Sequence, residues 1–142
     1  MPAMVIMSLW GVGGGLVIYL AGLQGVPSEL YEAAIVDGAG RWRKFWHVTV
    51  PMISPVILFQ LIMGIIGALQ TFTQGYVMTA GGPNNATLFF ILYLWRNAFQ
   101  RLRMGYASAL AWAIFTYILL LTLLVLRSSQ AWVFYTGEMK VR

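Results

Sequence analysis

Three long stretches without a charged residue constrain this chain more than any other feature. These stretches are residues 1–28, 45–95 and 104–126. A helix that crosses the hydrocarbon core of a bilayer needs about 20 apolar residues. The segments that reach this length are residues 3–23, 51–78 and 104–126. The sequence therefore predicts an all-α integral membrane protein with about three transmembrane helices.

The composition excludes several other classes of protein. The chain is 60% hydrophobic and 9% charged, with a mean hydropathy of +0.76, far outside the range of soluble domains. It has no cysteine and one histidine, so we expect no disulfide framework, no metal centre and no cofactor. The net charge of +5 is spread over three separated segments beside apolar runs. Membrane lipid is therefore the expected surrounding, and nucleic acid is not an expected partner.

The distribution of basic residues predicts how the chain is oriented. The first connection contains Arg41, Arg43 and Lys44. The second connection contains Arg96, Arg101 and Arg103, and the tail contains Arg127, Lys140 and Arg142. With three spans, the first connection and the tail share one side, which has six basic residues against three. That side is predicted to be cytoplasmic. Residues 87–94 are apolar but too short to cross, which predicts an interfacial or re-entrant helix in the second connection, packed against protein.

The first connection, residues 25–50, has the pattern of two short helices. Ser28 is expected to cap the first helix, over residues 29–37, and Gly38 to end it in the left-handed conformation. A second, amphipathic helix follows and is expected to end at Pro51.

One face of that second helix is aromatic. Trp42, Phe45, Trp46 and Thr49 recur at helical spacing. Two interpretations remain open: the tryptophans anchor an interfacial helix at the lipid headgroups, or they form a docking surface for a partner.

The same connection carries a spaced motif. It consists of Glu32-Ala33-Ala34, then three residues, Gly38, nine residues, and Val48-Thr49-Val50-Pro51. This pattern resembles the EAA signature of binding-protein-dependent ABC transporter permeases, with Val48 and Val50 as conservative departures. Residues 20–27 and 76–83 resemble the carbohydrate-uptake branch. The glycine-rich loop at 81–83 and residues 104–109 resemble its maltose-, lactose- or glycerol-phosphate-type first permease.

The resemblance implies a role for residues 24–50 as the cytoplasmic EAA coupling loop, which inserts into a cleft of the ATPase subunit. The implied ATPase-coupling residues are Glu32, Ala33, Ala34, Gly38 and Pro51. The implied partners are a second homologous permease subunit, a cytoplasmic ABC ATPase dimer and an extracytoplasmic sugar-binding protein. The implied location is the bacterial cytoplasmic (inner) membrane, as a multi-pass protein.

Family permeases are about twice as long as this chain, so the resemblance implies that residues 1–142 are the C-terminal portion of a permease transmembrane domain. The chain would then be a fragment, a truncated gene product or the result of an internal start.

Catalytic chemistry is not expected. The sequence lacks a glycine-rich phosphate-binding loop with a following lysine, and all four acidic residues lie outside the predicted spans. We therefore expect the chain not to be an enzyme, and the energy for transport to come from a partner.

The second predicted span carries a stripe of polar and small residues. Its members, Gln60, Gly64, Gly67, Thr71 and Gln74, recur at helical spacing on one face. Helix packing and contact with sugar hydroxyls both explain such a stripe. We assign packing to Gln60, Gly64 and Gly67, and assign the substrate path to Gln70, Thr71 and Gln74. Close packing is also favoured over unwinding for the glycines at 11, 13, 14 and 15.

Together these features predict a membrane-spanning permease subunit of an ATP-driven sugar importer. Two alternatives remain: a truncated permease that acts as a non-transporting membrane adaptor, or a small secondary carrier. The adaptor would not need the polar stripe, and the carrier would not need the motif at residues 32–38.

Overall fold

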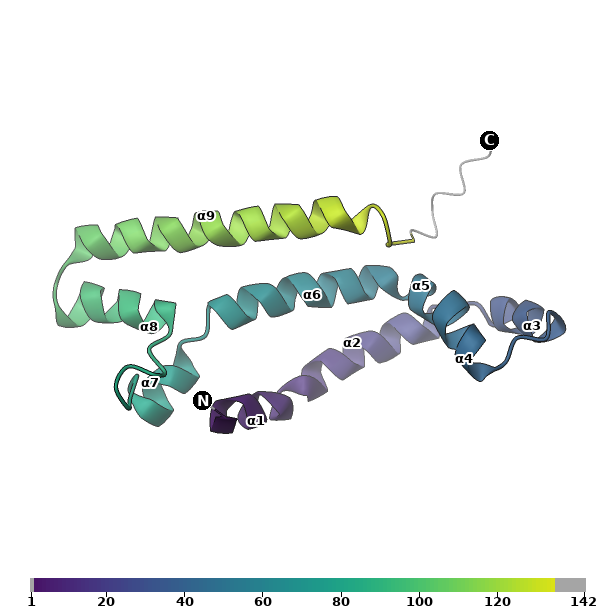
Figure 1. Ribbon diagram of the computed structural model, residues 1–142, viewed down its shortest axis with the longest axis horizontal. Helices are drawn as coiled ribbons and strands as arrows, with labels where there is room; N and C mark the ends of the chain where they lie inside the picture. Colours follow the sequence, from purple (N-terminus) through teal and green to yellow (C-terminus); the bar gives the residue numbers. More distant parts are fainter. Residues whose placement is uncertain (1, 135–142) are drawn as a thin grey trace. The chain divides into compact units, whose positions relative to one another are not determined.

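The structure is a computed structural model that describes residues 2–134. Every regular element in that range is helical (Figure 1), which confirms the predicted all-α class. Lys140 and Arg142, which entered the orientation argument, lie outside the described residues. The described residues form two compact units, and we describe each by itself: residues 10–61 with residues 126–134, and residues 62–125 with residues 2–9.

Within residues 2–134, two helical segments are long and apolar enough to cross a membrane. They are Val5–Gln24, which comprises most of α1 (Pro2–Trp10) and all of α2 (Val12–Gln24), and α9 (Met104–Ser129). The α1 and α2 assignments are separated at Gly11, whose backbone remains right-handed helical. The first and third predicted spans are therefore confirmed as helices of sufficient length and hydropathy.

The second predicted span is not one continuous helix. The chain bends by 66° at Ile53, between the helical segment Arg41–Met52 and α6 (Ser54–Leu69). A third membrane crossing is present only if these two segments together form one broken span. Alone, the 16 residues of α6 are about 24 Å long, less than the thickness of a hydrocarbon core. The chain leaves the helix after Leu69 and re-enters one at α7 (Thr73–Thr79), so a continuous helix over 51–78 was wrong.

Helices α2 and α6 approach closely within the first unit. The Gln60 Nε2 amide donates a hydrogen bond of 3.1 Å to the carbonyl oxygen of Gly15. A Cβ added to Gly22 would lie 2.8 Å from Cγ2 of Val56. The packing role predicted for Gln60 and Gly15 is thus confirmed, whereas a Cβ at Gly64 would meet no other described atom within 4 Å. Gly67, Gly13 and Gly14 are equally open toward the described residues.

The second unit contains an ordered connection between α7 and α9. It includes α8 (Phe90–Trp95) and the π-helical segment Arg96–Gln100. The Thr87 hydroxyl donates to the carbonyl of Gly82 at 2.8 Å and is 2.6 Å from the Thr79 hydroxyl. Because Thr87 is committed to this loop, the short helix begins three residues later than the predicted 87–94. It is not among the candidate spans, as predicted.

Candidate functional site

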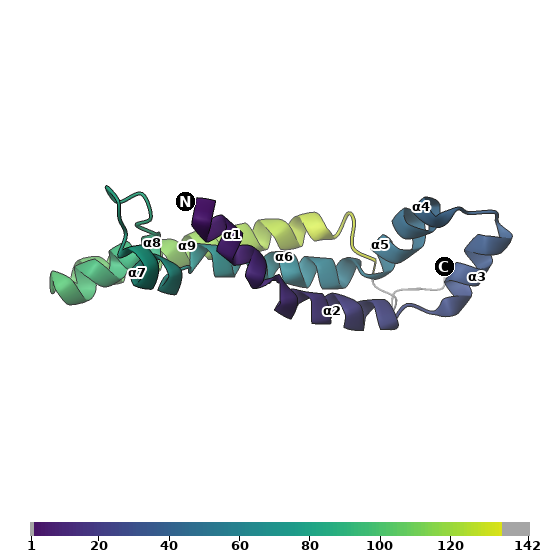
Figure 2. The ribbon, with the colours of Figure 1, turned by 90° about the horizontal axis from the view of Figure 1, so that it is seen from below.

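The connection after α2 forms two short helical arms, shown joined by a turn in Figure 2. The first arm is α3 (Ser28–Val36), and the second begins with α4 (Arg41–Lys44). Pro27, not Ser28, occupies the cap position, and no side chain caps the helix. Proline at this position has an extended backbone with ψ of 134°, which leaves Ser28 as the first helical residue. The predicted Ser28 cap was therefore wrong by one residue.

The end of α3 is a Schellman turn built around Gly38. Gly38 has a φ of +71°, a conformation that costs L side chains energy. Its N–H donates to the Ile35 carbonyl at 2.9 Å, and the Ala39 N–H donates to the Ala34 carbonyl at 2.9 Å. The predicted left-handed end of the helix is confirmed. The turn at Gly38 brings the residue after it into a hydrogen bond with Ala34, so the glycine and the alanine pair of the motif belong to one local structure.

The second arm changes helical type along its length. After α4 the chain adopts a π-helix, Phe45–Thr49, and then the short α5, Val50–Met52. Pro51 lies inside this arm and does not end it as predicted, because the arm continues to Met52 and breaks at Ile53. Proline normally clashes with the preceding turn of an α-helix, and the wider π turn before it is compatible with its presence.

One hydrogen bond ties the two arms together. The hydroxyl groups of Tyr31 on α3 and Thr49 on the second arm lie 2.9 Å apart, and the Thr49 side chain is buried. The Ser54 hydroxyl, at the bend that follows, donates to the Pro51 carbonyl at 2.6 Å and accepts from the Phe134 N–H at 2.9 Å. Neither contact was predicted from the sequence, since single hydroxyl groups recur throughout the chain.

The outward surface of the arms is charged and aromatic. Glu29, Glu32 and Asp37 are exposed on α3 or at its end, and Arg41 and Arg43 are exposed on α4. The first arm is therefore acidic and the second basic. Two tryptophans of the second arm are also largely exposed: Trp42 by 77% and Trp46 by 60%. These faces can accept a partner that offers both charged and apolar groups.

Among the implied coupling residues, four lie together on the first arm. Glu32 and Ala33 are exposed, Ala34 is half-buried, and Gly38 is exposed at the turn. Pro51 lies at the far end of the second arm and is half-buried. These four belong to α3 and the turn that ends it, whereas Pro51 belongs to the junction with α6.

The three residues predicted for the substrate path lie at the break between α6 and α7. Gln70 follows the last residue of α6, and Gln74 is in the first turn of α7; both are exposed. The Thr71 hydroxyl donates to the carbonyls of Ala68 at 3.0 Å and Gly67 at 3.2 Å, which caps α6. Thr71 and Gln74 are beyond the end of α6, so the predicted five-residue stripe on one helix face was wrong.

Aromatic packing accompanies this break. Phe72, with φ of −127° and ψ of −57°, stacks on Tyr76 with ring centroids 5.4 Å apart, and both rings lie against Trp95. Gly75 makes room for Phe89, because an added Cβ would lie 2.6 Å from the Phe89 ring. Neither group was singled out by sequence reasoning, although the aromatic spacing at 72 and 76 is a helical i, i+4 pair.

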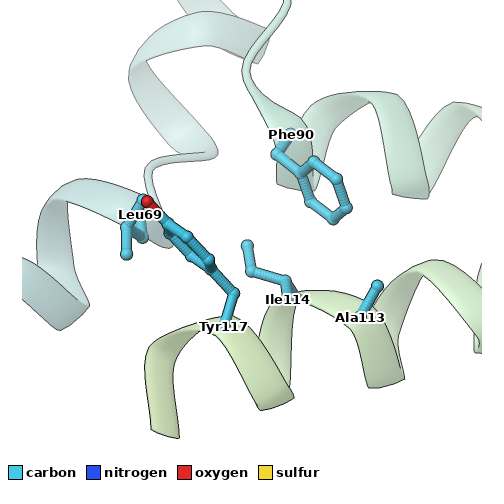
Figure 3. A pocket seen from close by; sticks show the side chains of 5 residues that line it. All are labelled: Leu69, Phe90, Ala113, Ile114 and Tyr117. Atoms are coloured by element: carbon cyan, nitrogen blue, oxygen red, sulfur yellow. The ribbon is translucent and has the colours of Figure 1, made fainter. Parts of the chain in front are cut away.

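A cavity of about 200 Å³ lies near the same break. It is lined by Leu69, Phe90, Ala113, Ile114 and Tyr117, whose side chains Figure 3 shows around a common space. Apart from the Tyr117 hydroxyl, these side chains are apolar, and a sugar needs several hydrogen-bonding partners. This cavity therefore does not supply a sugar site, and the exposed amides of Gln70 and Gln74 lie outside its lining.

Comparison with known families identifies the chain. Residues 1–133 match the family described as "Binding-protein-dependent transport system inner membrane component". The chain belongs to this family. The family is one of transporter permeases and not of catalytic enzymes, and its members are inner-membrane components that work with other transporter subunits.

Individual relatives agree with the family. The chain is 42% identical over 137 residues to the "Probable ABC transporter permease protein YesP" of Bacillus subtilis, covering 95% of this chain and 44% of the relative. It is 46% identical over 108 residues to the "Sulfoquinovosyl glycerol transport system permease protein SmoG" of Agrobacterium fabrum, covering 76% and 35%. It is 38% identical over 137 residues to the "Arabinooligosaccharides transport system permease protein AraP" of Bacillus subtilis, covering 95% and 43%. The chain thus spans less than half the length of these relatives.

The fold of this chain is similar to that of a chain in a solved ABC transporter structure. It is the "Crystal structure of a bacterial ABC transporter involved in the import of the acidic polysaccharide alginate", with a TM-score of 0.62 and 25% sequence identity. The match covers 81% of this chain and 41% of that chain. The predicted permease fold and the predicted family are therefore confirmed.

Proposed function

We propose that this chain is a membrane-spanning permease subunit of an ATP-driven sugar importer in the bacterial inner membrane. In this role it is the C-terminal portion of the permease transmembrane domain, and it does not itself catalyse a reaction. Its partners are a second homologous permease, a cytoplasmic ABC ATPase dimer and an extracytoplasmic sugar-binding protein. Relatives whose names specify a saccharide, such as the arabinooligosaccharide permease, support sugar as the transported class.

The observation that carries the coupling role is the geometry of the two-armed connection at residues 24–50. The Gly38 turn fixes the direction in which the chain leaves α3, and the Tyr31–Thr49 hydrogen bond holds the arms to each other. In this proposal the turn and the hydrogen bond make the two arms move together, so that a displacement of the tip is transmitted to the helix that follows. The helix that follows is α6.

Glu32 is the anchor of the docking surface in this proposal. Its carboxylate is exposed on α3, where it can accept charge-assisted hydrogen bonds from a basic group on the ATPase. Ala33 is exposed beside it and leaves space for close approach of the partner backbone. Gly38 acts through the direction of the turn, and Pro51 acts at the junction with α6.

Gln70, Thr71 and Gln74 form part of the translocation path in this proposal. They lie where the helix is interrupted, and interrupted membrane helices supply backbone and side-chain polar groups to substrate sites in other transporters. The exposed amides of Gln70 and Gln74 offer donors and acceptors to sugar hydroxyls. Thr71, whose proton is committed to α6 carbonyls, holds the end of that helix and can only accept.

The test uses the assembled transporter, reconstituted in proteoliposomes with its partner permease, ATPase and binding protein. Glu32→Ala is compared with Glu29→Ala, which removes the same charge from the same exposed helix. We expect Glu32→Ala to lower sugar-stimulated ATP hydrolysis and labelled sugar uptake at least about tenfold, since losing a charge-assisted hydrogen bond costs about 1.5–3 kcal/mol. Glu29→Ala should stay near wild type.

Two outcomes contradict the proposal. Equal ATPase co-purification and equal stimulated hydrolysis in the two glutamate variants would remove the docking role. A Gln74→Leu variant with unchanged uptake kinetics across a panel of saccharides would remove this residue from the translocation path. Normal insertion of each variant, checked by protease protection, separates these outcomes from misfolding.

A further inference from the structure

The turn that leads into α9 combines three unusual features. Leu102 has a φ of +52°, in the left-handed region that normally favours glycine, and its side chain is 77% exposed. It lies between two exposed arginines, Arg101 and Arg103. A large apolar side chain kept exposed in a costly backbone conformation and flanked by two cations calls for a contact partner.

Hydrogen bonds of the backbone and of a buried amide hold the conformation of the turn. The Arg101 N–H donates to the Arg96 carbonyl at 3.0 Å, and the Arg103 N–H donates to the Asn97 carbonyl at 2.9 Å. Asn97, only 1% exposed, donates its side-chain amide to the Tyr93 carbonyl at 2.8 Å and accepts from Arg101 Nη1 at 3.3 Å. One guanidinium group is therefore oriented, with most of its five N–H donors left for a ligand.

The electrostatics of the surrounding unit select an anionic ligand. Residues 1–9 and 62–125 include Arg96, Arg101 and Arg103 and contain no acidic residue. A hydrogen bond with Tyr106 lowers the pKa of Tyr93, and the charges of Arg101 and Arg103 lower it further. The Arg96 guanidinium is used internally, because it donates to the Ala80 carbonyl. The exposed positive charge is thus concentrated at the two arginines of the turn.

The length of α9 indicates the depth of the turn in a bilayer. Arg103 directly precedes α9, and Arg127 lies in its last turn, with no charged residue between them. Their separation of 24 residues corresponds to about 36 Å of helix, slightly more than the 30 Å or so of a hydrocarbon core. With the apolar part of α9 in the core, Arg103 and Arg127 lie at the headgroups of opposite leaflets.

We propose that the turn Arg101-Leu102-Arg103 binds the phosphate headgroup of an anionic phospholipid. The two guanidinium groups bind phosphate oxygens, and Leu102 inserts among the acyl chains. The exposed ring of Phe99, 60% accessible on the preceding helical turn, extends the apolar contact. The proposal requires only that α9 spans a bilayer, and it is independent of what the assembled transporter carries.

The test uses an environment-sensitive nitrobenzoxadiazole probe, which the absence of cysteine makes simple. The full chain with Leu102→Cys is labelled and placed in nanodiscs of phosphatidylcholine with an increasing fraction of phosphatidylglycerol. We expect the emission to shift to the blue as phosphatidylglycerol increases. A probe at Asn84→Cys, an exposed loop position, should show no such dependence.

Variants that remove the charges of Arg101 and Arg103 test whether these two side chains bind the headgroup. The double variant Arg101→Gln with Arg103→Gln should need more phosphatidylglycerol to reach the same blue shift, by about fivefold for each arginine removed. The double variant Arg101→Lys with Arg103→Lys keeps both charges and should retain most of the wild-type response. Arg41→Gln with Arg43→Gln removes equal charge from α4 and should leave the response at position 102 unchanged. A response equal to wild type in the 101/103 glutamine variant, or a probe at 102 as water-exposed as the one at 84, would overturn the proposal.

Discussion

The connections on the two sides of α6 stabilise themselves by different means. The arms of the α3–α4 connection are joined by the Gly38 turn and one bond between hydroxyl groups, and the Phe45 ring packs edge-on against Trp42 and Trp46 within the second arm. Most of its charged side chains and both indole rings remain exposed. The α7–α8 connection is held by hydroxyl-to-carbonyl bonds, by Arg96 on the Ala80 carbonyl and by stacked aromatic rings. The first connection (residues 24–50), called the sparse connection below, leaves most of its polar and indole side chains exposed to a partner. The second (residues 72–97, including Gly75 of α7), called the dense connection below, uses its side chains to hold its own conformation.

This difference separates two ways of positioning functional groups on a membrane helix. A sparse connection with a fixed turn can transmit force and still offer its surface, which suits docking. A densely bonded connection fixes the positions of polar residues at a helix break, which suits preorganised binding. The two connections should therefore respond differently to the same type of substitution.

The largest effect is expected at Gly75 in the dense connection. A Cβ there would lie 2.6 Å from the Phe89 ring and 3.2 Å from the Thr87 carbonyl oxygen, so Gly75→Ala should destabilise this unit by about 2 kcal/mol through overpacking. Hydrogen exchange of residues 72–97 in nanodiscs, followed by mass spectrometry, measures the loss of protection.

Gly64→Ala is the matched control for that substitution. Its added Cβ would meet no other described atom within 4 Å, and alanine favours a helix interior. Protection should stay the same or rise. If both variants lost protection equally, steric crowding at Gly75 would not explain the architecture of the dense connection.

A smaller effect is expected at Gly38 in the sparse connection. An added Cβ would meet open space, so the cost of Gly38→Ala is confined to the left-handed backbone, about 1 kcal/mol. Exchange should accelerate in α3 and α4 and remain unchanged in residues 72–97. Gly40→Ala, at a φ of −66°, should leave both regions unchanged, and equal effects at 38 and 40 would contradict the role of the turn.

Sequence reasoning reached those features that depend on local chemistry. Long apolar segments, the spacing from Glu32 to Pro51 and the left-handed Gly38 are local signals, and they were sufficient for the helical class, the family resemblance and the end of α3. The roles assigned to the motif residues and to Gln70, Thr71 and Gln74 stay predictions.

The features that were missed are places where a helix breaks or changes type, which helical spacing alone does not indicate. The break after Leu69 contains neither glycine nor proline, and it coincides with packing of Phe72 against Tyr76 and Trp95. The polar residues from 60 to 74 fit helical spacing equally well with or without that break. The predicted helix end at Pro51 was wrong for a related reason. The π-helix before Pro51 is compatible with a proline, whereas an ordinary α-helix would end there.

The smallest predicted effect tests whether the two arms of the sparse connection act as one body. Tyr31→Phe and Thr49→Val each remove one partner of a half-buried hydrogen bond, and a double-mutant cycle isolates their coupling from separate packing changes. We expect a coupling free energy of about 0.5–1 kcal/mol, the usual net value of such a bond. Exchange rates in α3 and α4 should rise together in each single variant, because loss of the bond releases both arms. Tyr19→Phe, on α2, serves as the control for removal of a tyrosine hydroxyl elsewhere in the same unit. Additive effects of the two substitutions, or faster exchange in only one arm, would mean that the arms move independently and that the Gly38 turn alone directs the docking surface.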